Sequence, residues 1–439
     1  MKLKLLIALM ITQGFAATYV HAEVPFSPAT PAIITFWEGI INRNEDNAHG
    51  VVLNQKNHLS AYVAIQASYF TKRANTPNNA SGYPISPYSD TSPNNKGKTT
   101  LNLATSEVYF DSQVTDWARV HIATAYAPDF SNTPTSSSFG VKDIFFTEAY
   151  AELNNFQQGA PLSIFTKIGR QYLNFTAQQY TVITHPLTED LGFTNATAIT
   201  VGAISEPGIY ADAYDYNGNP YGAAGSSINL NSQNRIHGWG AELGYAQSNN
   251  LQAWNIYADY IANLADSLAI SYNTYGAMGP DGWAAQYPNE QHPGYALHAN
   301  YNFGPLAIVT DYVGMISAFN SNVYSFNGHG AKLTAYAVEA NYTLPTQHAQ
   351  TISLGYQGSQ DAVQLFAIGN AFSMPKTRML IGYKYVLSPN IALKFEYMHD
   401  QDYAATDYAI NGSNLYPANV WYGSGNANDT VLARMNVTF

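Results

Sequence analysis

The chain has no cysteine and few charged residues for its length. None of its 439 residues is Cys, so disulfides and thiolate metal sites are excluded. Only 11% are Asp, Glu, Lys or Arg, whereas a soluble domain usually carries about 25%. After the N-terminal segment no run of about 18 apolar residues occurs, which argues against a spanning helix. Aromatic residues are abundant, with 34 Tyr, 20 Phe and 6 Trp. This composition indicates an outer surface that faces lipid.

The first 22 residues have the pattern of an export signal. Lys2 and Lys4 precede an apolar stretch over 5–11, and a small-residue cleavage site ends at Ala22. The sequence therefore predicts a signal peptide over 1–22, removed as the protein is exported through the periplasm.

The remaining chain is acidic. Two of the 19 basic residues lie in the signal segment, so 17 basic and 30 acidic residues remain, a net charge of −13. Binding of nucleic acid needs a basic footprint, so no nucleic-acid partner is expected. Solvated acidic loops account for the charge.

Residues 23–57 precede the first convincing strand. Five apolar residues of this segment fall on one helical face: Ile33, Ile34, Trp37, Ile40 and Ile41. The pattern predicts a short amphipathic helix, or a segment that lies against the rest of the protein.

From residue 58 onward, apolar and polar residues alternate in one segment after another. In 116–127, for example, Val120 and Ile122 alternate with Arg119 and His121, so one face of the strand is apolar and the other polar. Sixteen such segments are predicted: 58–70, 100–110, 116–127, 143–154, 161–170, 197–204, 208–216, 236–247, 251–262, 294–303, 305–314, 331–342, 349–358, those around 379–385 and 391–397, and 430–439.

The connections between these segments alternate between long and short. The long ones are 71–99, 128–142, 171–196, 217–235, 263–293, 315–330, 359–376 and 400–429; the short ones include 111–115, 248–250 and Gly304. A secreted β-sandwich has no reason to place all its long loops at one end. The pattern therefore predicts an all-β fold over 58–439, a closed antiparallel transmembrane β-barrel of about 16 strands with short periplasmic turns and long extracellular loops.

The last segment carries a family resemblance. Met435, Val437 and Phe439 continue an apolar face opposite Arg434, and the sequence ends on the aromatic residue. This resembles bacterial (Gram-negative) outer-membrane porin-like β-barrel proteins, whose last strand alternates in this way and ends in Phe. The resemblance implies that Met435, Val437 and Phe439 form a barrel-closure and assembly signal, and that 430–439 pairs with 58–70.

The resemblance also implies partners and a function. The expected partners are outer-membrane lipid and lipopolysaccharide, the barrel-assembly machinery, small hydrophilic solutes and, as in general porins, two further copies in a homotrimer. The expected function is a channel for passive diffusion. Sixteen strands enclose an aqueous lumen, and charges in the strands should face it, because a cation at mid-depth on the lipid face costs about 2–4 kcal/mol.

General porins fold their third long loop into the lumen. Here that loop is 171–196, which contains His185, Glu189 and Asp190. By this resemblance Glu189 and Asp190 line the pore constriction and face cations of the pore wall, for which the candidates are Arg119, Lys167, Arg170, Lys384, Lys394 and Arg434. The alternative is that both acids are solvated loop residues and that the wall charges only keep the lumen wet. The loop lacks the Pro-Glu-Phe-Gly-type pattern of enteric porins.

No enzymatic activity, cofactor or metal is expected. His121 and His298 lie on polar strand faces, but neither stands beside a hydrolase signature. Asp215, Asn217 and Asn219 begin like a calcium loop, yet Ser occupies position 226, where a ligating Glu is needed.

Two functions therefore stay open. The first is the diffusion channel. The second is a non-conducting outer-membrane surface protein or adhesin, whose Tyr- and Asn-rich loops 263–293 and 400–429 bind other molecules.

Overall fold

The structure, a computed structural model, describes residues 51–438 except for 55–56, 71–98, 127–144, 156–160, 174, 176–179, 206–207, 218–237, 249–251, 268–269, 271–290, 347–348, 364–373 and 412–418. The predicted signal peptide over 1–22, the predicted helix within 23–57 and Phe439 lie outside the described residues.

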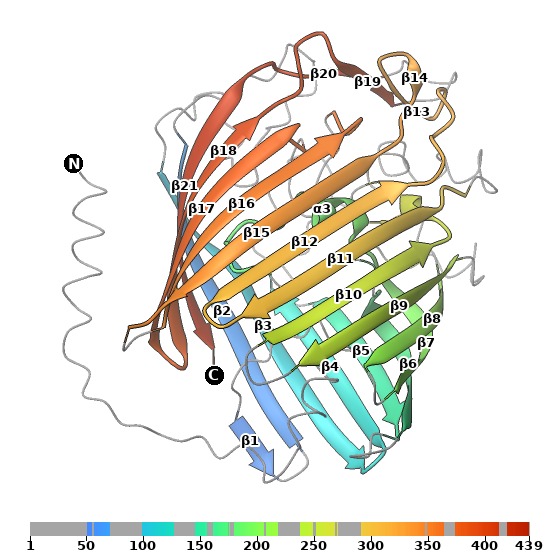
Figure 1. The fold of residues 1–439 in the computed structure, drawn as a ribbon, viewed down its shortest axis with the longest axis vertical. Coiled ribbons are helices and arrows are strands. Elements are labelled where there is room, and N and C mark those ends of the chain that lie inside the picture. The colour runs from blue at the N-terminus through green and yellow to red at the C-terminus, as the bar shows by residue number, and fades with distance from the viewer. Residues whose placement is uncertain are drawn as a thin grey trace.

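Antiparallel strands close into one barrel of 16 strands (Figure 1). They are β2 (Asn57–Phe70), β3 (Thr99–Thr115), β4 (Ala118–Tyr126), β5 (Phe145–Asn154), β6 (Leu162–Tyr172), β7 (Asn195–Ser205), β8 (Ile209–Tyr216), β9 (Gly238–Ser248), β10 (Gln252–Ile261), β11 (Gly294–Phe303), β12 (Leu306–Met315), β15 (Thr334–Leu344), β16 (Gln350–Gln360), β17 (Thr377–Ser388), β18 (Ile391–Gln401) and β21 (Ala427–Thr438). Every predicted strand segment overlaps one of them. The predicted all-β fold class, a closed antiparallel barrel, is confirmed.

The barrel closes between its last and first strands. β21 pairs with β18 on one side and with β2 on the other, where Arg434 lies opposite Gln66 and Met435 opposite Ile65. Arg434 donates a hydrogen bond of 2.8 Å from Nε to the Gln66 side-chain oxygen. The predicted pairing of 430–439 with 58–70 is thus confirmed.

Smaller elements accompany the sixteen strands of the barrel. β1 (Val51–Asn54) pairs with β2. A four-stranded sheet joins two of the long connections, in the order β14 (His329–Gly330), β13 (Tyr324–Phe326), β19 (Tyr408–Asn411) and β20 (Asn419–Tyr422). The third long connection contains α3 (Leu187–Gly192), and a 3-10 turn, η2 (Leu264–Asp266), follows β10. Within the described chain, no helix is long and apolar enough to cross a membrane.

The two faces of the barrel wall differ as the alternation predicts. On β9, the outward-facing Leu243 is 62% exposed, whereas its neighbour Glu242 is 3% exposed and faces inward. On β16, Leu354 is 57% exposed and the adjacent Ser353 is buried. An apolar outer wall and a polar inner wall are the pattern that a lipid environment requires of a barrel.

The inner wall of β8 and β9 pairs tyrosines with glycines. Tyr214 lies directly opposite Gly240, and Tyr210 opposite Gly244. A Cβ atom added at Gly240 would meet the Tyr214 ring at 2.2 Å. Both rings are buried. The glycines are therefore required so that the tyrosine rings can lie flat across the neighbouring strand.

Candidate functional site: the third long connection inside the barrel

Part of the third long connection, residues 180–192, lies inside the barrel. α3 packs against β12, β15 and β16 (Figure 1). The residues that bind this segment, among them Glu339 and Glu396, belong to the inward face, because they alternate with exposed outward residues such as Val338 and Tyr397. The segment is called the lumen loop below.

Glu396 of β18 holds the middle of the lumen loop. Its Oε2 accepts hydrogen bonds from the backbone N–H groups of Ile183, at 2.5 Å, and Thr184, at 3.1 Å. Its Oε1 accepts the hydroxyl of Thr184. Glu396 is 2% exposed. A buried carboxylate that accepts three hydrogen bonds is well compensated, and charge-assisted bonds of this kind are the strong ones.

Two further wall carboxylates hold the start of the lumen loop. Glu339 of β15 accepts the backbone N–H of Thr181 at 2.7 Å and that of Val182 at 3.4 Å. The hydroxyl of Tyr180 donates to Asp311 of β12. Consecutive backbone N–H groups of an irregular segment are thereby satisfied by the wall, as buried backbone groups must be.

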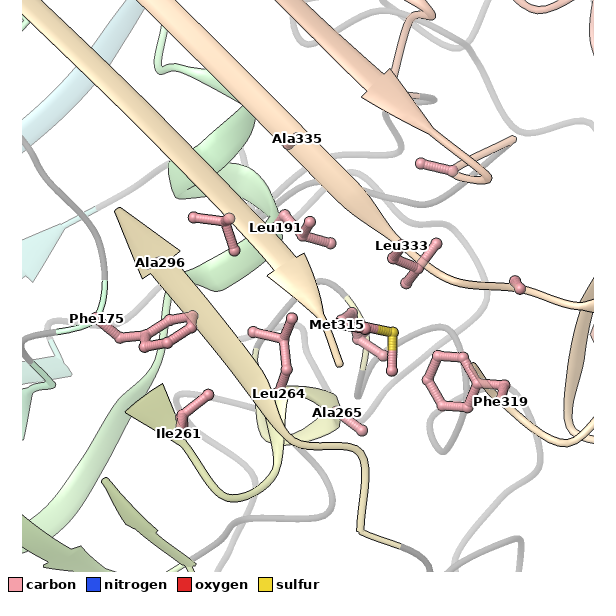
Figure 2. Close-up of a cluster of buried hydrophobic side chains, with 14 of the residues drawn as sticks. Phe175, Leu191, Ile261, Leu264, Ala265, Ala296, Met315, Phe319, Leu333 and Ala335 are labelled. Atoms are coloured by element: carbon pink, nitrogen blue, oxygen red, sulfur yellow. The ribbon is translucent and has the colours of Figure 1, made fainter. Parts of the chain in front are cut away.

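Apolar contacts accompany these hydrogen bonds. Val182 forms a buried cluster with Leu380 of β17 and Met398 of β18. Leu187 and Leu191 of α3 belong to a larger buried core, drawn in part in Figure 2. That core includes small inward-facing wall residues: Ala296 of β11, Val313 of β12 and Ala335 of β15. Small side chains at these positions leave room for the helix against the wall.

The start of α3 is also bound by the wall. The N–H of Leu187 donates to the side-chain oxygen of Gln357 on β16 at 3.1 Å. The first N–H groups of a helix have no partner within it, and Pro186 at the N-cap offers no side-chain acceptor. Gln357 therefore supplies a cap that the loop sequence lacks.

The two predicted constriction acids lie in the first turn of α3. Glu189 is buried and pairs with His185 at 2.8 Å. The Glu189 carboxylate raises the pKa of His185 to about 9. Burial raises the pKa of Asp190 to about 7, against the opposing effect of the Arg378 guanidinium. Glu189 is thus paired with His185 of the same loop, whereas Asp190 changes its charge near pH 7.

Three of the predicted wall cations form a row. Lys384 on β17 lies directly opposite Lys394 on β18, which lies directly opposite Arg434 on β21. All three side chains are partly exposed. Arg434 is close enough to His185 of the lumen loop to lower that histidine's pKa slightly. The row therefore belongs to the part of the wall near the lumen loop.

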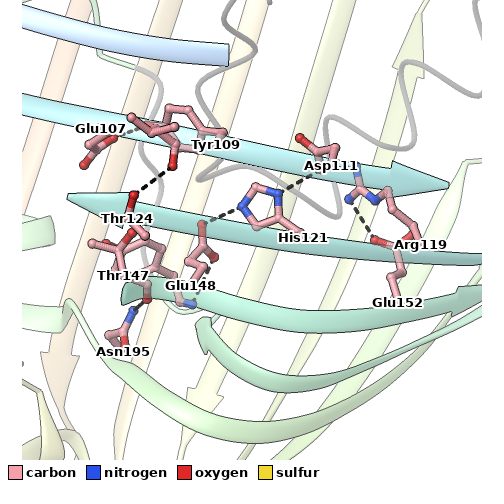
Figure 3. Close-up of polar contacts among 12 residues, drawn as sticks. Glu107, Tyr109, Asp111, Arg119, His121, Thr124, Thr147, Glu148, Glu152 and Asn195 are labelled. Carbon is pink, nitrogen blue, oxygen red and sulfur yellow. Dashed lines mark hydrogen bonds and ion pairs between the residues drawn. The ribbon is translucent and has the colours of Figure 1, made fainter. Parts of the chain in front are cut away.

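Two other predicted wall cations belong to polar clusters on β3–β6. Arg119 pairs with Glu152 at 3.0 Å, as Figure 3 shows. Lys167 is buried, with its Nζ 5.2 Å from the centre of the Tyr150 ring. Both residues face inward, and carboxylate or aromatic groups of neighbouring strands compensate their charges.

Arg170 is placed differently from the prediction. It shares the outer side of β6 with the exposed Ile168, and its direct partner on β7, Thr197, is exposed. Lys167 lies three positions earlier, and an odd spacing on a strand puts two residues on opposite faces. The expectation that Arg170 forms part of the pore wall is therefore wrong.

The two histidines that were considered for hydrolase chemistry, His121 and His298, are each enclosed by two carboxylates. His298 lies 2.9 Å from Asp259 and 2.7 Å from Asp311, and His121 lies 2.9 Å from Asp111 and 3.6 Å from Glu148 (Figure 3). Both ring nitrogens of each histidine thus face an acid rather than a hydroxyl nucleophile. The arrangement holds neighbouring strands together. Among the residues that the structure describes, no group of three or more His, Asp or Glu is placed to hold a metal ion.

The sequence interpretation missed the residues that hold the lumen loop. Glu339, Glu396 and Asp311 were expected only as lumen charges, and Gln357 was not singled out. One signal was present: near one end of β12 and β15 the inward face becomes apolar, at Val313, Ala335 and Ala337. A water-filled lumen does not favour apolar residues there, so these positions indicate that another segment covers the wall.

Comparisons with known proteins agree with this fold. No family model matches the chain. It is similar to a UPF0422 protein of Coxiella burnetii, with 27% identity over 354 residues that make up 78% of this chain and 68% of that protein. Its structure is similar to OprB of Pseudomonas putida, with TM-score 0.50, 9% identity and coverage of 88% of this chain and 94% of OprB. It also aligns with the outer membrane channel DcaP of Acinetobacter baumannii, with TM-score 0.49, 13% identity and coverage of 89% and 99%. In fold, the chain is a porin-like β-barrel.

Proposed function

We propose that this protein is an outer-membrane channel through which small hydrophilic solutes diffuse passively. The observation that carries the proposal is the lumen loop: a closed barrel with an apolar outer wall holds an ordered segment of its third long connection against the inner wall. Glu339, Glu396 and Asp311 make that attachment. An inserted segment narrows a lumen, which sets an upper limit on the size of a solute that diffuses through it.

In this proposal Glu189 and Asp190 lie at the narrowest part of the pore. Their place in the first turn of α3, on the lumen loop, supports this role. Lys384, Lys394 and Arg434 form the facing wall. Because Glu189 is paired with His185, Asp190 is the acid of the loop whose charge varies with pH near neutrality.

The location and assembly follow from the same proposal. An exported barrel with an apolar outer wall belongs in the bacterial outer membrane, inserted by the barrel-assembly machinery and surrounded by lipid and lipopolysaccharide. We further propose a homotrimer, which chemical cross-linking of the detergent-solubilised protein tests. No catalytic role is assigned to the channel.

One observation favours the alternative of a non-conducting surface protein. Residues of several long connections share one buried apolar core with the lumen loop. They include Leu264 and Phe319, which Figure 2 shows, and also Tyr324 and Tyr403. The four-stranded sheet of β13, β14, β19 and β20 adds to this ordered region. Loops that pack into a folded unit form a stable surface for binding a partner.

Planar-bilayer recording separates the two functions. Refolded protein, at limiting concentration in symmetric KCl, should give stable single-channel current steps if it is an open channel. A heat-unfolded sample provides the control. A correctly folded protein that inserts and yet gives no current would support the surface protein and contradict the channel.

A further inference from the structure

The small sheet of β13, β14, β19 and β20 has one face on the buried core and a second face that points away from it. Figure 1 shows β19 and β20 at the end of the barrel opposite to the C-terminus. Tyr324 of β13 and Ala409 of β19 belong to the buried core. Because successive side chains of a strand point to opposite faces, Tyr408 and Ile410, the neighbours of Ala409, point away from that core.

Two cross-strand pairs form this second face. Tyr408 lies directly opposite Tyr422 of β20, and Ile410 lies directly opposite Val420. The centres of the two tyrosine rings are 6.1 Å apart. Tyr422 is 46% exposed, and the other three residues are partly exposed. None of the four carries a charge. These four residues are called the tyrosine platform below.

The turn between β13 and β14 holds the tyrosine platform in place. The side chain of Asn327 accepts the N–H of Tyr408 at 2.9 Å and donates to Asp407 at 3.1 Å. Asn327 and Gly328 have positive φ angles of 49° and 83°, as a two-residue hairpin turn requires. A Cβ atom added at Gly328 would lie 3.3 Å from the Tyr408 hydroxyl, so the tyrosine lies beside this turn.

The segment that carries the platform is also fixed to the barrel. Tyr403, which precedes β19, is buried. Its hydroxyl lies 2.8 Å from the Ser359 hydroxyl of β16 and accepts the N–H of Ala362 at 3.1 Å. Asp402 accepts the N–H groups of Tyr403 and Ser424, each at 2.8 Å. The platform is therefore ordered before any ligand binds, which lowers the entropy that binding costs.

The chemistry of the platform fits a sugar. A tyrosine combines a flat apolar ring with a hydroxyl tip. A neutral hexose has the complementary character, with C–H groups on its faces and hydroxyl groups around its rim. Residues 403–426 are rich in Tyr, Asn, Gly and Ser, the residues that are enriched in the binding loops of antibodies. Rigid aromatic rings and hydrogen-bonding groups therefore occur together in this segment.

The size of the platform argues against a protein as the partner. A stable protein–protein interface takes about 20–30 residues from each partner and buries about 800 Å² on each. The platform consists of two residues from each of two strands, β19 and β20, which have four residues each. Such a surface has room for a short stretch of a sugar chain.

We infer that the tyrosine platform is a binding site for a neutral polysaccharide. Tyr408 and Tyr422 stack on the sugar rings, and Ile410 and Val420 extend the apolar surface beneath them. This function goes beyond solute diffusion and does not depend on it, because the platform lies on the connections outside the barrel wall.

Affinity electrophoresis of the refolded full-length protein tests this inference. The protein is run in mild detergent through native gels that contain dextran, mannan or galactan, and its mobility is compared with that in a gel without polysaccharide. At least one of the three should retard the wild type. In the variant Y408A/Y422A the dissociation constant derived from the retardation should rise about tenfold or more, since both aromatic contacts are lost.

Tyr342→Ala is the matched control. Tyr342 is 45% exposed on the outer wall of β15, so the variant removes an equally exposed ring outside the platform and should be retarded as the wild type is. Tyr422→Phe keeps the ring and should retain most of the binding. If Y408A/Y422A folds poorly, Tyr422→Ala alone should weaken the binding by a smaller factor.

The outcomes distinguish this inference from the proposed channel. Absence of retardation by all three polysaccharides, or an equal loss in Tyr342→Ala and Tyr422→Ala, overturns the polysaccharide site whether or not the protein conducts. If no polysaccharide binds and Y408A/Y422A changes the oligomeric state measured by light scattering, the platform is a contact between copies of the chain and the inference is wrong. A protein that binds polysaccharide through the platform but gives no current contradicts the channel and supports the polysaccharide site.

Discussion

The carboxylate of Glu396 accepts a hydrogen bond of 3.1 Å from the backbone N–H of Thr184, although the two residues are 212 positions apart in the chain. This contact joins a strand near the end of the barrel to a segment of its third long connection. Because the N–H of Ile183 donates to the same oxygen, the position of the lumen loop depends on the side chain of this one wall residue.

Replacing Glu396 by Gln should loosen the lumen loop without removing its bulk. An amide oxygen accepts less strongly than a carboxylate, and the amide nitrogen would face the backbone donors of Ile183 and Thr184. Hydrogen bonds to charged groups contribute about 1.5–3 kcal/mol. Amide hydrogen exchange over 181–184 should therefore become about tenfold faster or more, as measured by mass spectrometry on the refolded protein.

Asp116→Asn is the matched control for this variant. Asp116 is exposed in the turn between β3 and β4, so its neutralisation should leave exchange over 181–184 unchanged. Equal protection of these amides in wild type and Glu396→Gln would show that the carboxylate does not hold the loop.

The strands could be predicted from the sequence because each crosses an environment that constrains both of its faces. Lipid requires apolar residues on one face of each strand. This requirement produces the alternation of apolar and polar residues in the strand segments between residues 58 and 438. The attachment of the lumen loop could not be predicted in the same way. A polar inner face is expected whether its acids contact water or a loop backbone, so Glu339 and Glu396 carry no distinguishing pattern.

Two further differences between the sequence prediction and the structure have physical causes. Arg170 was assigned to the lumen because it is charged, although its spacing from Lys167 puts it on the other face of β6. Near a strand end, a long cationic side chain can extend from the outer wall toward water. β13, β14, β19 and β20 have four residues or fewer, too few for an alternation to be recognised.

The charge of Asp190 should make ion selectivity depend on pH. Its pKa of about 7 in the folded protein lies above the ordinary value of 3.8 because burial disfavours the ionised form. Asp190 is therefore neutral below about pH 6 and becomes negative as the pH rises through 7. The permeability ratio of anions to cations, measured as a reversal potential in a KCl gradient, should fall between pH 6 and pH 8.

The variant Asp190→Asn should lose this pH dependence. The raised pKa of Asp190 also affects stability, because the folded protein disfavours the ionised form of this acid. The docked loop should therefore become less stable as the pH rises from about 4 to 7. His185, with its pKa of about 9, keeps its charge over this range. A reversal potential that falls equally in wild type and Asp190→Asn would assign the titration to another group.

Gly240→Val should impair folding of the barrel. The new side chain would collide with the buried Tyr214 ring, which lies 2.2 Å from the ideal Cβ position. Overpacking of this kind costs about 1–3 kcal/mol. The midpoint of urea unfolding in detergent should fall. Ala241→Val adds a similar bulk on the outer face and should change the midpoint little; similar losses in both variants would contradict the pairing of Tyr214 with Gly240.

Leu354→Arg tests the outward orientation of β16. Leu354 is 57% exposed on the outer wall. A cation on the lipid face costs about 2–4 kcal/mol at the bilayer midplane. Unfolding free energies of the variant in lipid vesicles should fall by about this amount, whereas Leu354→Ala should lose less. An arginine variant as stable as the alanine variant would place residue 354 away from lipid.

A cysteine pair tests most directly whether the third connection lies inside the barrel. A Cβ atom added at Gly382 of β17 would lie 3.2 Å from Cγ1 of Val182 on the lumen loop. In a cysteine at position 182 the Sγ atom can take the place of Cγ1, and in a disulfide each Sγ lies about 3 Å from the Cβ of its partner, since the S–S bond is about 2.05 Å long. The chain has no other cysteine to compete. The measurement is disulfide formation in refolded V182C/G382C, followed by thiol labelling, and single-channel conductance before and after reduction. The structure predicts near-complete cross-linking, no labelling before reduction and the same conductance in both states, because the disulfide fixes the loop where it already lies. Two freely labelled thiols in a folded, conducting barrel would contradict the account.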